Sequence, residues 1–417
     1  MSTFTYQNGQ LACGPVPLAS LADQFGTPLY VYSADAIRAR YQRLAAAFAP
    51  LQPLICFAVK ANASVALLRL LRAEGAGFDI VSGGELFCAL RAGAAPEHIV
   101  FAGVGKTEAE LTEGLAAGIG WFNIESADEL ARLNYLAVAR GQRARVAVRL
   151  NPNVAPDTHH HIQTGGATNK FGLPLTAALD LARRVPAEFP AIDLRGVHIH
   201  IGSQVPDPTA TLAALEVALT FAAQVDGVDT LDLGGGFPVA YRETDQFTPI
   251  EAFAAPLVAR LRPLAGRLRL HLEPGRYLVA EAGALLTTVQ AVKDVAGRRT
   301  LVVDAGMQTL LRPALYDAYH GVAPLQQAAP ETSVLTDVVG PICESADVLA
   351  RERALPTLMP GQRLAVLTAG AYGFSMASQY NSQPRPAEVL VDGARARLVR
   401  RRETYADLVA AEETLHD

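Results

Sequence analysis

Cysteine and lysine are both scarce in this sequence. The 417 residues include four cysteines: Cys13, Cys56, Cys88 and Cys343. They are too few and too scattered for a disulfide scaffold or a CxxC metal site, which fits a reducing compartment. Lys and Arg together number 36, yet the lysines are only Lys60, Lys106, Lys170 and Lys293. Each lysine is therefore a candidate for an individual role.

Long apolar runs and an excess of positive charge are also missing. No apolar run approaches the roughly 20 residues that a membrane span requires, and the richest Ala/Leu stretch contains Glu216. The first ten residues have neither the basic nor the apolar segment of a secretory signal. A net charge of −5 argues against a general nucleic-acid-binding protein. We expect a cytoplasmic protein with no membrane or nucleic-acid partner.

The sequence does contain apolar material in a regular alternation. Hydrophobic residues make up 50% of the chain, which excludes a mainly disordered protein. From about residue 54, short apolar runs alternate with amphipathic stretches such as SVALLRLLRAEGA. The eight runs are PLICFAV, FDIV, HIVFAG, WFNI, RVAVRL, LRGVHIH, TLDLG and LRLHLE. Eight strands in strict βα alternation predict a closed, TIM-type (β/α)8 barrel.

After residue 280 the pattern changes to extended runs separated by turns. The segments TTVQAVKDV, RTLVVDAG, TSVLTDVVG, RLAVLTAG and EVLVDGARARLV predict strands, and Asp392-Gly393 predicts a hairpin turn. We therefore predict an α/β protein in three parts. Residues 31–274 form the barrel, residues 275–417 form a mostly-β, sandwich- or barrel-like domain, and residues 1–30 pack with that β domain.

Unusual polar residues fall where the predicted barrel strands end, which is where (β/α)8 barrels carry their chemistry. Lys60 directly follows the first strand, in FAVKAN, where partial burial favours a nucleophilic amine that can attack a carbonyl. His198, His200 and Ser203 come at the end of the sixth strand. Glu273 ends the eighth strand and, once buried, requires a partner.

Two segments after the last two strands suit a phosphate group. The run Gly234-Gly235-Gly236 follows the seventh strand and lets backbone N–H groups approach an anion. The run Glu273-Pro274-Gly275-Arg276 follows the eighth strand, a common phosphate site in TIM barrels. A nucleophilic lysine, a phosphate cradle, an imidazole to stack on a flat ring and a carboxylate for a ring nitrogen together predict pyridoxal 5′-phosphate.

The histidine pair offers a second interpretation. His198 and His200 lie on one face of their strand, as in metal-dependent barrel hydrolases. Such a site requires further ligands. The run His159-His160-His161 could supply one, although its polar surroundings favour solvation. We predict that no metal is bound and keep the hydrolase as an alternative.

A second group of candidates lies in the predicted β domain. Arg312 and Tyr316 occur in MQTLLRPALYDAYH, Cys343 and Glu344 in GPICESAD, and Tyr372 in GAYGFSMAS. Taken singly, each has an ordinary explanation, such as a surface arginine, a core cysteine or a core tyrosine. Taken as sequence motifs, they are highly specific.

These motifs, with FAVKAN, DIVSGGEL, FAGVGKT, HIHIGSQ, LDLGGGFPVAY and EPGRYLVAEAG, run through nearly the whole chain. On them the sequence resembles the diaminopimelate decarboxylases, fold-type III pyridoxal-phosphate enzymes related to alanine racemase and to ornithine and arginine decarboxylases. The resemblance implies a carboxy-lyase that converts meso-2,6-diaminopimelate to L-lysine and carbon dioxide, the last step of lysine biosynthesis.

The resemblance also implies roles for the candidates. Lys60 would hold the cofactor covalently, and His200 would stack on its ring. Cofactor contacts would further come from Ser203, Gly234, Gly235, Gly236, Glu273, Pro274, Gly275, Arg276 and Tyr372. Substrate contacts would come from Arg276, Arg312, Tyr316, Glu344 and Tyr372. Cys343 and Glu344 would reach the site from the partner subunit of a homodimer, and Cys343 or Lys60 would protonate the α-carbon of the substrate.

Two further alternatives stand beside the hydrolase. A sibling decarboxylase acting on ornithine, arginine, carboxynorspermidine or an amino acid of specialised metabolism would share the fold and cofactor. Substrates without a distal carboxylate would leave Arg276 and Arg312 with less to bind, which favours diaminopimelate. A non-catalytic protein on the same fold would be expected to lose Lys60 or Cys343, and the sequence retains both.

Overall fold

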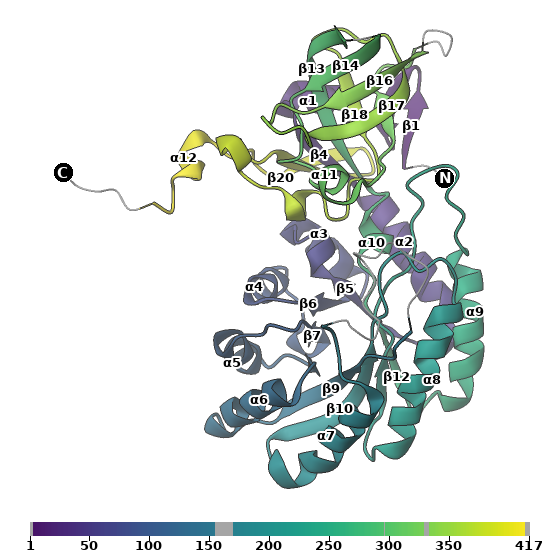
Figure 1. The fold of residues 1–417 in the computed structure, drawn as a ribbon, viewed down its shortest axis with the longest axis vertical. Helices are drawn as coiled ribbons and strands as arrows, with labels where there is room; N and C mark the ends of the chain where they lie inside the picture. The colour runs from purple at the N-terminus through teal and green to yellow at the C-terminus, as the bar shows by residue number, and fades with distance from the viewer. Residues whose placement is uncertain (1–2, 155–169, 296, 329–332, 413–417) are drawn as a thin grey trace, which may run out of the picture. The chain divides into compact units, whose positions relative to one another are not determined.

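Residues 3–154, 170–295, 297–328 and 333–412 are described by the structure, a computed structural model (Figure 1). The chain divides into two units. The barrel unit comprises residues 38–240 and 246–278, and the β unit comprises residues 1–37, 241–245 and 279–417. The candidate residues of the sequence are distributed over both units.

The barrel unit contains a closed, all-parallel barrel in which the eighth strand pairs with the first. Its strands are β5 (Leu54–Ala58), β6 (Gly77–Ile80), β7 (Ile99–Phe101), β8 (Trp121–Ile124), β9 (Ala144–Leu150), β10 (Ile192–Ile199), β11 (Thr230–Asp232) and β12 (Arg269–Leu272). Each of the eight predicted apolar runs overlaps one of these eight strands, so the prediction of a TIM-type barrel is confirmed. Since all strands are parallel, their carboxyl ends lie at one end of the barrel.

Helices follow the strands and cover the barrel (Figure 1). They are α3 (Val65–Ala73), α4 (Gly83–Arg91), α5 (Glu108–Ala117), α6 (Ala127–Ala139), α7 (Leu175–Glu188), α8 (Thr209–Gln224) and α9 (Ile250–Leu261). Ser82, Thr107 and Ser126 cap the first N–H groups of α4, α5 and α6.

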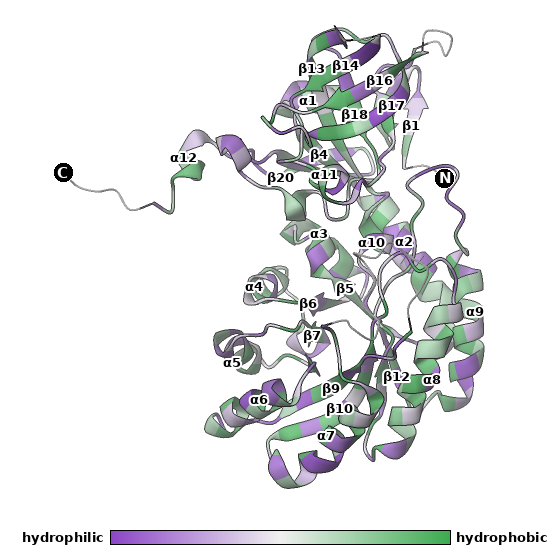
Figure 2. Cartoon of the chain, in the orientation of Figure 1, coloured by the Kyte–Doolittle hydropathy of each residue, from purple (hydrophilic) through white to green (hydrophobic). Residues whose placement is uncertain are grey.

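The apolar face of α9 shows how the sequence places a helix on the barrel. It buries Ile250, Phe253, Ala254, Leu257 and Leu261, at the three- and four-residue spacing of one helix face. Figure 2 shows hydrophobic and hydrophilic residues mixed along α7 and α9 in the same way. None of the helices among the described residues is both long enough and apolar enough to cross a membrane.

The β unit contains a nine-stranded sheet with the main order β17-β16-β14-β13-β4-β19-β20, in which β18 pairs with β13 and β15. The bounds are β4 (Leu29–Ser33), β13 (Gly283–Val295), β14 (Arg298–Val303), β15 (Val322–Pro324), β16 (Ser333–Val339), β17 (Val348–Pro356), β18 (Arg363–Val366), β19 (Ala387–Asp392) and β20 (Arg395–Arg400). Asp392 pairs with Arg395 across the predicted hairpin turn, which confirms the turn. The second, mostly-β part of the predicted fold class is thereby confirmed as well.

The N-terminal residues belong to the β unit through β4. This strand is antiparallel to β13 and parallel to β19, so it lies inside the sheet. Its Leu29 and Val31 join an apolar core with Leu286 and Val389. The β unit extends to residue 37, includes residues 241–245 and resumes at residue 279.

Smaller elements complete the two units. The β unit also contains β1 (Phe4–Gln7), β2 (Gln10–Cys13), β3 (Val16–Pro17), α1 (Leu18–Phe25), α11 (Arg312–Tyr316) and α12 (Tyr405–Leu408). The helices α2 (Ala34–Ala47) and α10 (Arg276–Val279) span the divisions between the units.

Candidate active site

Lys60 lies in a single 3-10 turn, Val59–Ala61, directly after β5. Its side chain is 38% exposed, and its Nζ lies 3.0 Å from Oδ2 of Asp79, a buried carboxyl group on β6. Burial and the charge of Glu273 raise the pKa of Asp79 to about 6, against the opposing effect of Lys60. The ion pair holds the amine of Lys60 at the carboxyl end of the barrel.

The other lysines are placed differently. Lys106 is buried, and its Nζ donates to two carbonyl oxygens and to the carboxylate of Glu129, which lies 2.6 Å away. These three hydrogen bonds engage every N–H of the ammonium group, so Lys106 is not available as a nucleophile. Lys170 and Lys293 are exposed. Lys60 is therefore the lysine whose surroundings suit chemistry.

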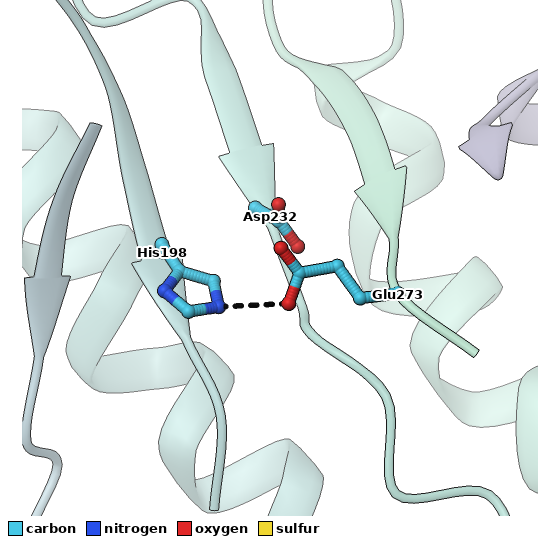
Figure 3. A group of neighbouring side chains, drawn as sticks. All are labelled: His198, Asp232 and Glu273. Atoms are coloured by element: carbon cyan, nitrogen blue, oxygen red, sulfur yellow. Dashed lines mark hydrogen bonds and ion pairs between the residues drawn. The ribbon is translucent and has the colours of Figure 1, made fainter. Parts of the chain in front are cut away.

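Glu273 follows β12, and its carboxylate points toward the end of β10 (Figure 3). Its Oε2 lies 3.1 Å from Nε2 of His198, and its Oε1 accepts a hydrogen bond of 3.3 Å from Nδ2 of Asn123. Burial alone would raise the pKa of Glu273, but the interactions with His198 and Lys60 outweigh it and lower that pKa well below its usual value. Glu273 is an ionised, buried carboxylate that can face a protonated ring nitrogen.

Asp232, the last residue of β11, lies beside Glu273 (Figure 3). Its Oδ1 accepts the N–H of Gly234 at 2.8 Å, and its Oδ2 is buried without a hydrogen-bond partner among the described residues. Burial and the charge of Glu273 raise the pKa of Asp232 well above its usual value. The pKa values of these two neighbouring carboxyl groups are therefore shifted in opposite directions.

The geometry also bears on the metal alternative. Among the described residues, His198, Asp232 and Glu273 offer ligand atoms within 4.8 Å of one another, close enough to hold a metal ion. His200, the second histidine of that alternative, is not part of this group. The run 159–161, proposed as a further ligand source, lies outside the described residues.

His200 faces the glycine run after β11. The N–H of Gly235 donates to Nδ1 of His200 at 3.1 Å, so the proton of a neutral ring resides on Nε2. Burial, with the charges of Arg149 and Lys60, lowers the pKa of His200 well below its usual value. A neutral imidazole is thus fixed beside the cavity described below, as required of a group that stacks on a flat ring.

The backbone after β11 and β12 is shaped to approach an anion. Gly234 and Gly236 have φ values of 64° and 95°, and a Cβ on Gly235 would lie 2.2 Å from the carbonyl oxygen of Glu273. The N–H groups of Gly236 and Gly275 have no acceptor among the described residues. Backbone N–H donors on glycines, which have no side chain to block the approach of an anion, are suited to binding a phosphate group.

Three further candidates lie at the same end of the barrel. Nε of Arg276 donates to Oγ of Ser203 at 3.2 Å, which brings these two residues together. The carbonyl oxygen of Pro274 accepts the N–H of Ala58 at 3.0 Å and so ties the end of β12 to β5. The barrel unit therefore gathers all of its predicted site residues within a few strand ends.

A cavity of about 430 Å³ opens among these groups. It is lined by Lys60, His198, His200 and Glu273, together with Val81, Ala102, Gly103, Val104, Gly105, Glu110, Arg149 and Phe171. This volume lies in the range of small-molecule and cofactor sites.

Three residues of this region were not among the sequence candidates. Asp79 binds Lys60, Asn123 binds Glu273, and Arg149 pairs with the buried Glu125 at 2.7 Å. Each is a polar residue inside an otherwise apolar strand segment, in FDIV, WFNI and RVAVRL. The polar candidates of the barrel come at or after the ends of the predicted strands. Polar residues inside those strands are the signal that could have identified these three.

The remaining candidates lie in the β unit. Arg312 begins α11 and is buried, with Nη1 2.8 Å from Nε2 of His320 and its guanidinium 4.5 Å from the ring centroid of Tyr241. Tyr316 ends α11 and is partly exposed. Tyr372 is also partly exposed and has a positive φ of 55°.

Cys343 and Glu344 lie in the loop between β16 and β17. The carboxylate of Asp347 shapes this loop by accepting two backbone N–H groups, at 2.6 and 2.7 Å. Cys343 is exposed, and its Sγ lies 3.2 Å from Nδ2 of Asn381. Glu344 is exposed and accepts a hydrogen bond of 2.5 Å from the hydroxyl of Tyr380. Both candidates are therefore presented at the surface of the unit.

Comparison with known proteins adds an independent observation. Residues 34–280 match the family model described as the pyridoxal binding domain of pyridoxal-dependent decarboxylases. A diaminopimelate decarboxylase of Pseudomonas fluorescens is 45% identical over 100% of both chains. The crystal structure of diaminopimelate decarboxylase from M. jannaschii in co-complex with L-lysine has a TM-score of 0.92 at 36% identity and covers 99% of this chain and 98% of its own.

A more distant likeness extends to a sibling activity. The crystal structure of lysine/ornithine decarboxylase from Vibrio vulnificus, complexed with putrescine, has a TM-score of 0.79 at 26% identity. It covers 90% of this chain and 97% of its own.

Proposed function

The chain belongs to the diaminopimelate decarboxylases, a family of pyridoxal-dependent decarboxylases, and from that premise we propose how its residues remove carbon dioxide from meso-2,6-diaminopimelate to leave L-lysine. The observation that carries the proposal is the set of groups in the barrel unit. It combines the amine of Lys60, the ionised carboxylate of Glu273, the neutral ring of His200 and the N–H of Gly236, which has no acceptor among the described residues. These are the partners that an aldehyde, a pyridine nitrogen, an aromatic face and a phosphate require.

Each part of pyridoxal 5′-phosphate would be held by a different group. Lys60 would bind the aldehyde carbon covalently, and His200 would lie against the ring. Glu273 would accept a hydrogen bond from the ring nitrogen and keep it protonated, because its own pKa is low. The phosphate would be held by Ser203, Gly234, Gly235, Gly236, Pro274, Gly275 and Arg276, with Tyr372 as a further contact.

Bound pyridoxal 5′-phosphate supplies an electron sink for the pair left on the α-carbon when the carboxylate departs as carbon dioxide. His198 and Asn123 hold the carboxylate of Glu273 in place. This carboxylate is therefore already oriented before the reaction and does not have to move during it. Val81, Val104 and Phe171 contribute apolar surface to the lining of the cavity. A proton then has to be delivered to the α-carbon, and Cys343 or Lys60 is the proposed donor.

The distal end of the substrate carries a carboxylate and an ammonium group. Arg312 and Arg276 would bind the carboxylate, because a guanidinium offers a planar pair of donors. Glu344 would bind the ammonium, and Tyr316 and Tyr372 would complete the contacts. We propose that Cys343 and Glu344 reach the site from the second subunit of a homodimer, which agrees with their exposure in the single chain. The cytoplasmic location stays a prediction.

A substrate comparison tests the proposed reaction. The purified protein, loaded with pyridoxal 5′-phosphate, should release lysine and carbon dioxide in equal amounts from meso-2,6-diaminopimelate. We expect kcat/KM for this substrate to exceed that for ornithine or arginine by at least about 100-fold, because those substrates lack the distal carboxylate that Arg276 and Arg312 would bind. A preference for ornithine would replace the proposal by a sibling decarboxylase.

Subunit mixing tests the shared site. Lys60→Ala chains and Cys343→Ala chains should each be nearly inactive. After exchange in an equal mixture, half of the dimers are mixed, and one of the two sites in a mixed dimer holds both wild-type residues. We therefore expect recovery of about a quarter of the wild-type activity. A mixture that exchanges subunits, as verified by mass spectrometry of a tagged chain, but regains no activity would show that each site lies within one chain.

A further inference from the structure

A second cavity lies entirely within the β unit, on the side of α11 that packs against β17. It has a volume of about 340 Å³ and shares no residue with the barrel cavity. Its polar lining comes from Arg242, Arg351, Arg353, Tyr319 and Asp317. Its apolar lining consists of Pro313, Ala314, Ala318, Ala346, Val348, Leu349 and Ala350. We call it the arginine cavity.

The three arginines of this cavity have no carboxylate partner in the part of the chain that the structure describes. Within the described ranges, no ion pair joins Arg242, Arg351 or Arg353 to an acidic side chain. Glu352, which lies between the last two in sequence, is instead 3.3 Å from the guanidinium of Arg298. The cavity therefore collects positive charge that the unit itself does not neutralise.

Arg353 is the least satisfied of the three. Its Nε is buried without a hydrogen-bond partner in the described part of the chain, and its Nη1 donates to the carbonyl oxygen of Arg351 at 3.0 Å. Burial lowers the pKa of Arg353, and the charge of Arg242 lowers it further, against an opposing effect of Tyr319. An anion in the cavity would relieve both effects.

Tyr319 fixes two of the arginines in position. The guanidinium carbon of Arg353 lies 3.8 Å from the centroid of the tyrosine ring, and that of Arg242 lies 4.7 Å from it. Contacts of this kind hold the planar guanidinium groups without using their N–H donors. Asp317 is exposed and is the single acidic residue in the lining, so the lining has an excess of two positive charges.

We propose that the arginine cavity binds a small organic anion that carries a phosphate group. Preorganised guanidinium donors match the several oxygens of a phosphate, and the excess of two positive charges matches a dianion. The alanine, valine and leucine side chains accommodate a compact apolar body beside it. None of the residues proposed to hold the cofactor phosphate lines this cavity, so the two sites consist of different residues.

Calorimetric titration of the cofactor-loaded protein with inorganic pyrophosphate tests this proposal. The protein is first loaded with pyridoxal 5′-phosphate and then freed of unbound cofactor, so that the barrel site is filled and no free phosphate-carrying anion competes. A constant ionic strength removes general screening effects. We expect one saturable site per chain that is not displaced by a saturating concentration of L-lysine. Arg242→Gln and Arg353→Gln should each weaken binding at least about tenfold, since each removes a charged donor.

Arg298→Gln is the matched control, because it removes a paired surface arginine of the same unit and should leave binding within about twofold. Thermal melting and decarboxylase activity establish that each variant is folded. The proposal is overturned if pyrophosphate does not saturate below about 10 mM, if L-lysine displaces it, or if Arg298→Gln weakens binding as much as the cavity variants do. It is also overturned if Arg353→Gln dissociates the oligomer in sedimentation, because the cavity would then be filled by a second copy.

Discussion

Replacing Lys60 by alanine is expected to lower the rate of decarboxylation by about 10⁴-fold or more, as the loss of a covalent catalytic group does in other enzymes. No other lysine can substitute for it. Lys106 has all three N–H groups engaged, and Lys170 and Lys293 are exposed. The measurement is single-turnover decarboxylation of meso-2,6-diaminopimelate, together with reduction of the loaded wild-type protein by borohydride. The reduced cofactor should be found on the peptide that contains Lys60.

The Lys60→Ala variant leaves Asp79 buried without its ion-pair partner. Since burial already raises the pKa of Asp79 to about 6, the carboxyl group should protonate in the variant rather than remain charged. The charged form is the one that burial destabilises, so any loss of stability should grow as the pH rises through neutrality. The double variant Lys60→Ala with Asp79→Asn should remove this dependence while remaining inactive.

Lys293→Ala serves as the matched control for this experiment, because it removes an exposed lysine of the β unit and should keep wild-type activity. Recovery of the label on Lys106 or Lys170, or a Lys60→Ala variant with more than about one hundredth of the wild-type rate, would contradict the assignment.

The second large effect concerns substrate recognition by Arg312. Truncation of Arg312 to alanine should leave the distal carboxylate of the substrate without a charged partner, a loss of about 2–5 kcal/mol for a desolvated pair. This corresponds to a reduction in kcat/KM of at least about 30-fold. Part of the loss should appear in kcat, because distal binding also orients the α-carboxylate for departure. Steady-state kinetics with meso-2,6-diaminopimelate measure both constants.

The visible absorbance of the bound cofactor separates substrate binding from a general loss of structure. It should be unchanged in Arg312→Ala, since the proposed cofactor contacts of the barrel unit are retained. Arg312→Lys should recover only part of the activity, because an ammonium group lacks the planar pair of donors. Arg298→Ala is again the control and should have no measurable effect on kcat/KM. Full activity in Arg312→Ala would mean that the distal carboxylate is bound elsewhere.

Local patterns in the sequence were sufficient for the barrel and for most of the proposed cofactor residues. Each strand of a parallel barrel is recognised in the sequence as a short apolar run. Lys60, His200 and Glu273 come at the ends of such runs, so their position at the strand ends could be predicted from the adjacent residues alone. Gly234 and Gly236 could be predicted for the same reason. A glycine run after a strand indicates a backbone conformation that residues with a Cβ rarely adopt, and both glycines have a positive φ. The edge strand β17 was not predicted, since ARER breaks the apolar pattern that identifies a strand.

What the sequence determined by itself is therefore the barrel, its mostly-β companion and the identity of the residues at the strand ends. Only the tertiary structure decided which of these residues meet. Asp79 lies 3.0 Å from Lys60, His198 lies 3.1 Å from Glu273 across 75 residues, and β4 pairs between β13 and β19. The same holds for Arg242 and Arg353, whose common contact is Tyr319. The physical reason is that hydrophobic periodicity and turn chemistry act between near neighbours, whereas ion pairs, buried charges and strand order depend on closing the sheet over large sequence separations.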